Sequence, residues 1–348
     1  MTTSEMTPHL TVVMPVKNAQ PYLDAAVESI LSQSLENFEF VIRDDASTDG
    51  TRDRLRYWAA RDGRIRLFEG LKGLGPAGSS NWVVEQARTP IVARMDADDV
   101  ARPDRLRRQL EILRHNPDAV LVGSLWEGID RKDRVVRPPN LTVLGRSGFA
   151  APLAHGSIMF RRESFEKAGK YRSECDFWED LDLYQRMAQI GRILFTVSPL
   201  YQHRFSETST RLTSGATRVE DSVELMFRCR QALERGEDYE YLVYAPRLPR
   251  RRLDPNTFLS LGSITLWSGV RPGTLQRLVK RGRLGFNLTS ARALVWAAWA
   301  ATSPRSLRFV MRQRLRIKHK NVLKQLAGQS VCEWKPQGIT VLVPNDGS

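Results

Sequence analysis

Apolar and polar positions follow two different spacings along residues 8–210. Short apolar runs, which predict buried strands, occur at 10–16, 38–42, 64–68, 91–93, 119–125 and 195–200. Segments with apolar residues at helical spacing lie between them, at 21–35, 51–60, 80–88, 102–115 and 177–187. Strands that alternate with helices are typical of a largely parallel sheet with helices on its faces. The pattern therefore predicts an α/β fold for this part of the chain.

The most unusual polar stretch is Asp96-Ala97-Asp98-Asp99, which directly follows an apolar run. Carboxylates this close repel one another unless a cation lies among them, and their oxygens suit a divalent metal. In an extended segment Asp96 and Asp98 point to one face, whereas Asp99 points away and is expected to cap the next helix. A solvated acidic turn ahead of that helix is the alternative interpretation.

Three other motifs accompany this stretch in a characteristic order. They are the segment from Thr11 to Asn18, the acidic and hydroxyl-rich stretch from Asp44 to Thr51, and Trp178-Glu179-Asp180. With Asp96-Ala97-Asp98-Asp99 they resemble the motifs of the family-2 glycosyltransferases, over about residues 8–210. The resemblance implies the GT-A fold, which is a Rossmann-like mixed sheet with flanking helices. It also implies transfer of a sugar from a nucleotide-sugar donor.

The same resemblance assigns roles to individual residues. Asp98, with Asp96, would hold Mn²⁺ or Mg²⁺ against the diphosphate of the donor, and His203 would complete the metal shell. Asp180 would be the catalytic base, with Glu179 beside it. The residues expected to contact the nucleotide sugar are Pro15, Val16, Asn18, Asp45, Asn81 and Asp96. His155 and Trp178 would lie on the sugar or acceptor side.

Several of these positions have a simpler structural interpretation. Asp45 lies in a sequence that is typical of turns, and a structural role is the alternative for a single histidine such as His155. The helix dipole favours a carboxylate such as Glu179 at the start of a helix. Arg204 is the alternative to His203, because the arginine that precedes this histidine in the family is replaced here. Ser80 occupies a position where the family often has a basic residue. Lys72 is the alternative residue for a basic contact with the nucleotide.

The formal net charge of +14 is concentrated at one end of the chain. Residues 1–210 contain 29 basic and 29 acidic side chains, whereas residues 211–348 contain 24 and 10. We therefore expect a catalytic domain at 1–210 and a helical, basic C-terminal region at 211–348. A basic amphipathic helix expected at 303–327, near Trp296 and Trp299, favours contact with an anionic membrane surface. Packing of this helix on the catalytic domain is the alternative.

Other features favour a cytoplasmic protein that is peripheral at the inner face of the membrane. Cys175, Cys229 and Cys332 are far apart, so neither a disulfide framework nor a structural zinc site is indicated. Residues 1–9 lack the pattern of a secretory signal. The longest apolar stretch, 293–301, is much shorter than the roughly 20 residues of a membrane span.

These observations predict a glycosyltransferase of cell-surface polysaccharide biosynthesis. The expected donor is a UDP-sugar, the acceptor is a hydroxyl of a glycan or lipid-linked molecule, and the anomeric centre is inverted, as in most of the family. A basic nucleic-acid-binding protein is one alternative. However, aromatic residues are not interleaved with the basic ones, so no nucleic-acid partner is expected. A sugar nucleotidyltransferase is another alternative, but the segment from Thr11 to Asn18 lacks the glycine-rich basic loop that it requires.

Overall fold

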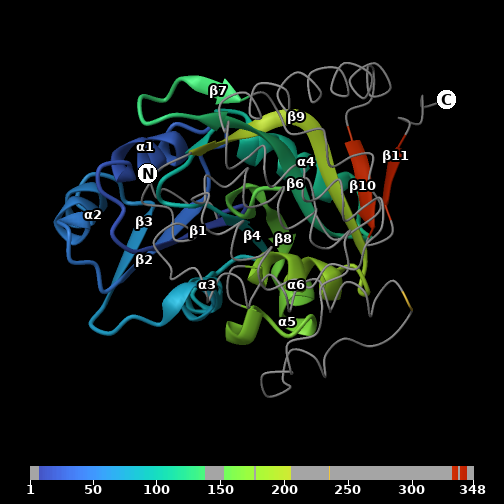
Figure 1. The fold of residues 1–348 in the computed structure, drawn as a ribbon, viewed down its shortest axis with the longest axis horizontal. Coiled ribbons are helices and arrows are strands. Elements are labelled where there is room, and N and C mark those ends of the chain that lie inside the picture. Colours follow the sequence, from blue (N-terminus) through green and yellow to red (C-terminus); the bar gives the residue numbers. More distant parts are fainter. Residues whose placement is uncertain are drawn as a thin grey trace, which may run out of the picture. The chain divides into compact units, whose positions relative to one another are not determined.

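The computed structural model describes residues 8–137, 153–175, 178–204, 235, 331–335 and 338–342, and one mixed sheet runs through them (Figure 1). The strand order is β11-β10-β9-β6-β8-β4-β1-β2-β3. Strands β1, β2, β3 and β4 are mutually parallel, as are β6 and β9, whereas β8 is antiparallel to both β4 and β6. The predicted α/β fold with a mixed sheet is therefore confirmed.

The parallel half of the sheet consists of β1 (Thr11–Val16), β2 (Glu39–Asp45), β3 (Ile65–Gly70) and β4 (Ile91–Arg94). The other strands are β5 (Val100–Ala101), β6 (Ala119–Ile129), β7 (Val135–Arg137), β8 (Met159–Arg161), β9 (Arg192–Arg204), β10 (Val331–Lys335) and β11 (Gly338–Leu342). The helices are α1 (Leu23–Leu31), α2 (Thr51–Ala59), α3 (Gly75–Glu85), α4 (Arg105–His115), α5 (Arg162–Lys167) and α6 (Glu179–Met187). Two 3-10 turns, η2 (His155–Ser157) and η3 (Ser173–Cys175), connect them.

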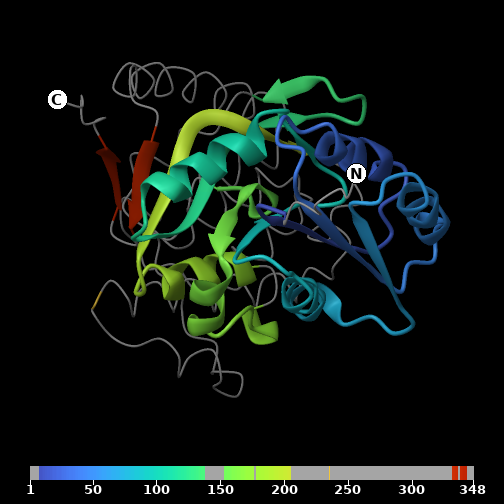
Figure 2. The same cartoon turned by 180° about the vertical axis from the view of Figure 1, so that it is seen from behind.

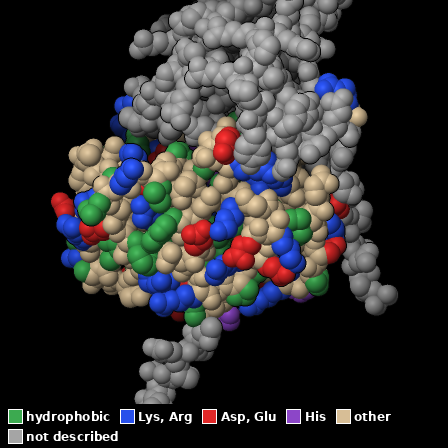
Figure 3. All heavy atoms as spheres, turned by 90° about the horizontal axis from the view of Figure 1, so that it is seen from below, with side chains coloured by type: hydrophobic (Ala, Val, Ile, Leu, Met, Phe, Trp, Pro, Cys, Tyr) green, Lys and Arg blue, Asp and Glu red, His purple; other side chains and the backbone are tan. Residues whose placement is uncertain are grey.

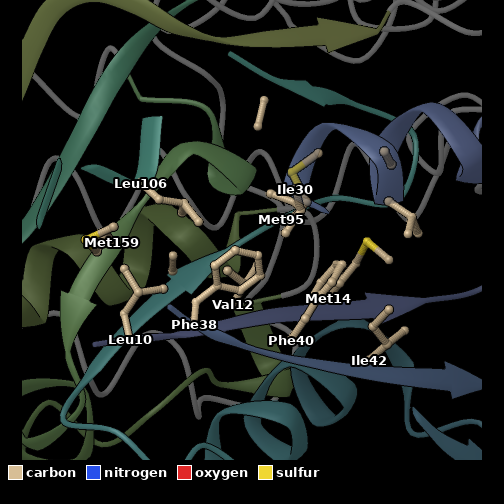
Figure 4. Packing of buried hydrophobic residues seen from close by; sticks show 14 of the residues in the cluster. Leu10, Val12, Met14, Ile30, Phe38, Phe40, Ile42, Met95, Leu106 and Met159 are labelled. Atoms are coloured by element: carbon tan, nitrogen blue, oxygen red, sulfur yellow. The ribbon is translucent and has the colours of Figure 1, made fainter. Parts of the chain in front are cut away.

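Helices cover both faces of the sheet, because successive side chains of a strand point to opposite faces. Val12 and Met14 of β1 belong to a core cluster that includes the apolar sides of α1, α2 and α4 (Figure 4). Val13, between them in the sequence, belongs to a second cluster with residues of α3, α5 and α6. Burial on both faces explains why these strands are continuous apolar runs rather than alternating ones.

The structure differs from the prediction at the start of α3. This helix begins at Gly75, five residues before the predicted helical segment 80–88, so Gly75, Pro76 and Gly78 lie in its first turns. The carboxylate of Asp45 accepts hydrogen bonds from the backbone N–H groups of Leu74 and Gly75 at 2.8 and 3.1 Å. A carboxylate from another strand thus satisfies N–H groups at the start of the helix that would otherwise lack partners.

The second half of the sheet is also more extensive than predicted. Strand β6 continues to Ile129, beyond the predicted run 119–125, and β7 follows at Val135–Arg137, where no strand was predicted. Strand β9 begins at Arg192 and continues to Arg204, and its residues Tyr201 and Gln202 pair with β5. Asp99 does not cap α4, whose N-cap residue is Asp104. Figure 2 shows the long, curved β9 beside α4 on this side of the sheet.

The C-terminal region was predicted to be helical, but its far end contains two strands, at 331–335 and 338–342. Strand β10 pairs antiparallel with β9, and β11 pairs with β10, so both belong to the sheet of the catalytic part (Figures 1 and 2). The predicted helices and basic segments between 211 and 330 lie outside the described residues. Among the residues that the structure does describe, no helix is both long enough and apolar enough to cross a membrane.

The surface of the described part reflects its even charge balance. On the face in Figure 3, basic and acidic side chains are interspersed among the described residues. Many of them pair with each other, as Arg56 does with Glu69 and Arg64 with Asp62. We therefore interpret these charges as a solvated surface stabilised by local pairs, each of which contributes little.

Candidate active site

The candidate site lies where the parallel strands β1, β2 and β4 end, which is where open α/β sheets bind their ligands. Strand β4 is next to β1 in the sheet and delivers Asp96 and Asp98 to this edge. The backbone N–H of Asp96 donates to the hydroxyl of Tyr201 on β9, at 3.3 Å. The acidic stretch is thus tied to a strand that lies far from it in the sequence.

Asp96 forms an ion pair with the buried Arg94, two residues earlier on β4. Burial alone would raise the pKa of Asp96, but the positive charge of Arg94 outweighs burial and lowers it. The pKa of Arg94 is raised in turn, because Asp96 outweighs the opposing effect of burial. Asp96 is therefore held as a carboxylate in a fixed orientation.

The negative charge of Asp98 is poorly balanced by positive charge nearby. Burial, together with the neighbouring charges of Asp99 and Asp96, raises the pKa of Asp98 to about 7, and His203 offsets this only in part. A raised carboxylate pKa means that the site lacks positive charge. A divalent cation would supply the missing charge.

Asp99 turns away from Asp98 and anchors the end of β9. It is fully buried and accepts a hydrogen bond from the backbone N–H of Arg204 at 2.7 Å. His203 Nδ1 lies 3.1 Å from the other oxygen of Asp99. The Arg204 side chain donates to the backbone carbonyl of Asp98 at 2.6 Å. The tip of β9 therefore holds the shape of the acidic stretch.

His203 lies beside the acids, as predicted, but its contact there is with Asp99. Burial of the ring would lower the pKa of His203, but Asp99, with help from Asp98 and Asp96, outweighs burial and raises it to about 9. A metal ligand must be a neutral imidazole. Coordination by His203 would therefore require it to lose a proton that these carboxylates stabilise, and its role as a ligand stays a prediction.

The predicted base lies at the start of α6. Glu179 and Asp180 occupy its first turn, where the helix dipole stabilises negative charge. Asp180 Oδ1 accepts a hydrogen bond from the N–H of Leu181 at 2.8 Å. His155 Nδ1 lies 3.9 Å from Oε1 of Glu179, which places the predicted acceptor-side histidine next to this pair.

Two buried tyrosines and the turn η2 lie near both acidic motifs. Burial raises the pKa of Tyr171, and the charges of Asp180, Glu179 and Asp96 raise it further, while Arg94 opposes them. Burial also raises the pKa of Tyr184, with Asp180 and Asp96 again among the causes. The contacts of η2 give the geometric link. A Cβ on Gly156 would lie 2.7 Å from Oδ2 of Asp96, and Nδ1 of the preceding His155 lies 3.9 Å from Oε1 of Glu179, so η2 lies next to both acidic motifs.

The predicted nucleotide side is built around the ends of β1 and β2. Pro15 and Val16 form the end of β1, and Val16 is buried. Asn18 donates from its backbone N–H to Ser47 Oγ at 2.9 Å and accepts from the N–H of Thr48 at 2.8 Å. Asn18 thus shapes the loop after β2. Asp45 is only 3% exposed, and its contacts with α3 give it a capping role in addition to any base contact.

Two predicted residues have structural contacts that the sequence did not suggest. Asn81 donates from Nδ2 to the carbonyl of Tyr171 and accepts from the Tyr171 N–H, both at 2.9 Å. The described contacts of Asn81 therefore position Tyr171, and its contact with the nucleotide stays a prediction. Trp178 is 2% exposed and is one of the buried hydrophobic residues, and its place on the sugar or acceptor side stays a prediction.

Comparison with known proteins agrees with this geometry. The family model described as Glycosyl transferase family 2 matches residues 11–177. The chain is 30% identical over 243 residues to the putative glycosyltransferase EpsE of Bacillus subtilis (strain 168), covering 68% of this chain and 87% of EpsE. The chain is a family-2 glycosyltransferase. It is also 39% identical over 106 residues to the putative teichuronic acid biosynthesis glycosyltransferase TuaG of the same strain, over 30% of this chain and 42% of TuaG.

Solved structures support the GT-A fold of this glycosyltransferase. The mannosyltransferase PcManGT of Pyrobaculum calidifontis, in complex with GDP-Man and Mn²⁺, superposes with a TM-score of 0.55 at 20% identity, over 91% of this chain and 88% of that one. Residues 1–349 of S. aureus TarS, in complex with UDP-GlcNAc, give 0.50 at 16% identity, over 63% and 65%. At these identities the likeness concerns the fold alone.

Some residues of the glycosyltransferase site were not identified from the sequence. Arg94 and Tyr201 both contact Asp96, and Tyr171 contacts His155 at 2.8 Å. Gly156 lies against Asp96 and Tyr201 so closely that a Cβ there would be 1.8 Å from the Tyr201 hydroxyl oxygen. The position of Arg94 within two residues of Asp96 was the only local signal for any of them.

Asp96 and Asp98 fit a metal ion whose remaining ligands come from the phosphates of the substrate. Among the described residues, no group of three His, Cys, Asp or Glu side chains is arranged to hold a metal ion. Mg²⁺ and similar ions are often bound by one or two carboxylates, with substrate phosphates and water as the other ligands. Asp98, whose raised pKa marks a deficit of positive charge, and Asp96 match that arrangement.

Proposed function

We propose that this glycosyltransferase uses a UDP-sugar donor and Mn²⁺ or Mg²⁺, and transfers the sugar to a hydroxyl group with inversion. The observation that carries the proposal is that η2 lies next to both acidic motifs, with Gly156 against Asp96 and His155 near Glu179, the residue before Asp180. A donor diphosphate held near Asp96 and Asp98 would have its sugar directed toward Asp180. This arrangement brings the bond that breaks next to the group that takes up a proton.

Asp98 and Asp96 would hold the metal ion. When bound, the ion neutralises the negative charge that develops on the departing nucleoside diphosphate. Mn²⁺ is present with GDP-Man in PcManGT, and UDP-GlcNAc is present in TarS, so the fold accommodates both kinds of ligand. We take UDP as the donor nucleotide from the family resemblance. The carboxylate of Asp45, at the end of β2, can accept a hydrogen bond from the N–H of a uracil edge and equally from that of a guanine edge, so the donor screen decides the base.

Asp180 would act as the base. The acceptor hydroxyl oxygen forms a bond to the anomeric carbon while the bond from that carbon to the diphosphate oxygen breaks. The hydroxyl proton passes to Asp180, and the electron pair of the broken bond leaves with the nucleoside diphosphate. A single displacement of this kind inverts the anomeric centre. Asp180 is suited to it because the start of α6 stabilises its charged form.

We further propose that the acceptor is a glycan or lipid-linked molecule in cell-surface polysaccharide synthesis. The relative TuaG carries a putative role in teichuronic acid biosynthesis, and chondroitin synthase of Escherichia coli is 26% identical over 191 residues. The basic region at 211–348 would hold the enzyme at the inner face of the membrane, where a lipid-linked acceptor is presented. Of residues 211–330, the structure describes residue 235 alone.

The test is a screen of nucleotide sugars for donor hydrolysis by the full-length protein. We expect release of the nucleoside diphosphate from one UDP-sugar in the presence of Mn²⁺ or Mg²⁺, and none with EDTA. Asp98→Asn is the matched negative control. Hydrolysis of a GDP-sugar instead would correct the donor base. Equal hydrolysis with EDTA and with metal would refute the metal role.

A further inference from the structure

Tyr171, His155 and Glu179 form a chain of polar contacts that ends beside Asp180. The Tyr171 hydroxyl lies 2.8 Å from His155 Nε2, and His155 Nδ1 lies 3.9 Å from Oε1 of Glu179. All three are largely buried, since 14% of the His155 side chain, 15% of the Glu179 side chain and 4% of Tyr171 are exposed. They come from η2, from the segment after α5 and from α6, so only the fold brings them together.

Tyr171 is held in place from outside the site. Asn81 on α3 clamps its backbone with two hydrogen bonds of 2.9 Å. Its ring packs edge-on against Phe165 at a centroid distance of 5.4 Å, and against the His155 ring at 5.2 Å. The hydroxyl is therefore presented to His155 by a fixed backbone and a packed ring.

The chemistry of the two partners determines where the proton of His155 lies. The Glu179 carboxylate lies 3.9 Å from Nδ1, which is too far for a hydrogen bond, but its negative charge favours a proton on the ring nitrogen that faces it. In a neutral imidazole the other nitrogen, Nε2, then accepts a hydrogen bond from the Tyr171 hydroxyl. Burial and the nearby carboxylates raise the pKa of Tyr171, so this hydroxyl keeps its proton and can donate.

We propose that Tyr171 and His155 are positioning residues for the base. The Tyr171 hydroxyl fixes His155 as the Nδ1–H tautomer, and the electrostatic attraction between this N–H and the Glu179 carboxylate, 3.9 Å away, draws that carboxylate toward His155. Two adjacent carboxylates that share a proton would weaken each other as bases. With Glu179 directed toward His155, and Asp180 Oδ1 bonded to the Leu181 N–H, the two carboxylates are held apart. The inference rests on the proposed role of Asp180.

The tautomer can be measured without any sugar substrate. The chain has five histidines, so the side-chain nitrogen signals of ¹⁵N-histidine-labelled full-length protein can be assigned to His155 by their loss in His155→Gln. We expect wild-type protein to show a protonated Nδ1 and an unprotonated Nε2. A protonated Nε2 with an unprotonated Nδ1 in the wild type overturns the proposal, whatever the variants do.

Two tyrosine variants form a matched pair for the same spectrum. Tyr171→Phe removes the donor to Nε2, and the His155 signals should move toward a mixture of tautomers. Tyr184 is another fully buried tyrosine near Asp180, and its hydroxyl has no hydrogen-bond partner within the part of the chain that the structure describes. Tyr184→Phe should therefore leave the His155 signals unchanged. Equal changes in both variants would show a general packing effect and would overturn the proposal.

Kinetics with the acceptor separate positioning from binding. Loss of a single positioning hydrogen bond should lower kcat by roughly three- to tenfold in Tyr171→Phe and in His155→Gln. The KM for the donor should not change, and the double variant should be no slower than the slower single variant. A raised donor KM with unchanged kcat, or multiplying effects, contradicts the proposal. If the wild type transfers no sugar, the proposed function fails, whereas the tautomer measurement still decides this inference.

Discussion

Gly156 lies where η2 approaches the acidic stretch most closely, and we expect Gly156→Ala to disrupt the site. A Cβ at this position would be 1.8 Å from the Tyr201 hydroxyl oxygen and 2.7 Å from Oδ2 of Asp96. Since non-bonded heavy atoms pack at about 3.5 Å, one of these groups would have to move by more than about 1 Å. Neither moves easily. Tyr201 is fully buried with the Arg105 guanidinium 5.2 Å from its ring centroid, and Asp96 is paired with Arg94.

The expected magnitude follows from this close packing. An added methyl group in a packed core costs about 1–3 kcal/mol, and we expect the upper end here, about 3 kcal/mol. For a domain of roughly 150–250 residues, 1 kcal/mol lowers Tm by about 2–4 °C, so Tm should fall by about 6–12 °C. Turnover of the donor should fall as well, because Asp96 is displaced.

The assay is thermal unfolding of the full-length protein by calorimetry, with Gly63→Ala as the matched control. Gly63 has no atom within 4 Å of its Cβ position, so that variant should unfold within about 2 °C of the wild type. Gly156→Ala combined with Tyr201→Phe should recover part of the loss, since the nearest clashing atom is gone. If Gly156→Ala matches Gly63→Ala in both Tm and turnover, the close approach of η2 to Asp96 is wrong.

The remaining predictions concern charge at the site and beyond it. Asp98→Asn should weaken both Mn²⁺ and donor binding in calorimetric titration, and unchanged donor affinity with Mn²⁺ would remove Asp98 from the metal site. Asp180→Asn should leave donor binding nearly intact and lower turnover by about 10²–10⁴. If Glu179→Gln alone abolished turnover, the roles of the pair would be reversed. In EDTA, the stabilisation from the His203–Asp99 pair should be complete below the unfolded histidine pKa of about 6.5 and should disappear as pH rises through about 9, because the folded pKa of His203 is raised. The Tm of His203→Gln should consequently vary less over this pH range, and identical curves would refute the pairing. Replacing Arg250, Arg251 and Arg252 with glutamine should weaken co-sedimentation of the full chain with anionic vesicles, since each basic residue near the surface contributes about 1 kcal/mol. Equal binding to neutral vesicles would contradict electrostatic attachment.

The vesicle experiment uses substitutions because of where the chain returns to the sheet. A truncation near residue 245 would remove the basic region, but it would also remove β10 and β11. Strand β10 pairs with β9, the strand whose tip holds Asp99 through Arg204. Loss of activity or binding in such a truncation could therefore come from damage to the sheet.

The sequence alone determined the elements of the catalytic part and the order of its motifs. Apolar spacing is a local property, so 51–60 was predicted as a helix and 91–93 as a strand, in agreement with α2 and β4. The two acidic stretches that contain Asp96, Asp98 and Asp180 could also be recognised in the sequence, because adjacent carboxylates repel one another and therefore suggest a functional role. Family resemblance then supplied their proposed roles.

The tertiary structure decided which partner each polar side chain has. Asn81 clamps the backbone of Tyr171, 90 positions away, and Asp99 binds the backbone of Arg204, 105 positions away. Asp45 caps a helix that starts 30 positions later, and β10 joins β9 across the whole basic region. Hydrogen bonds and ion pairs form between groups that packing brings within about 3 Å. Because packing depends on the faces of distant segments, no local pattern in the sequence contained these pairings.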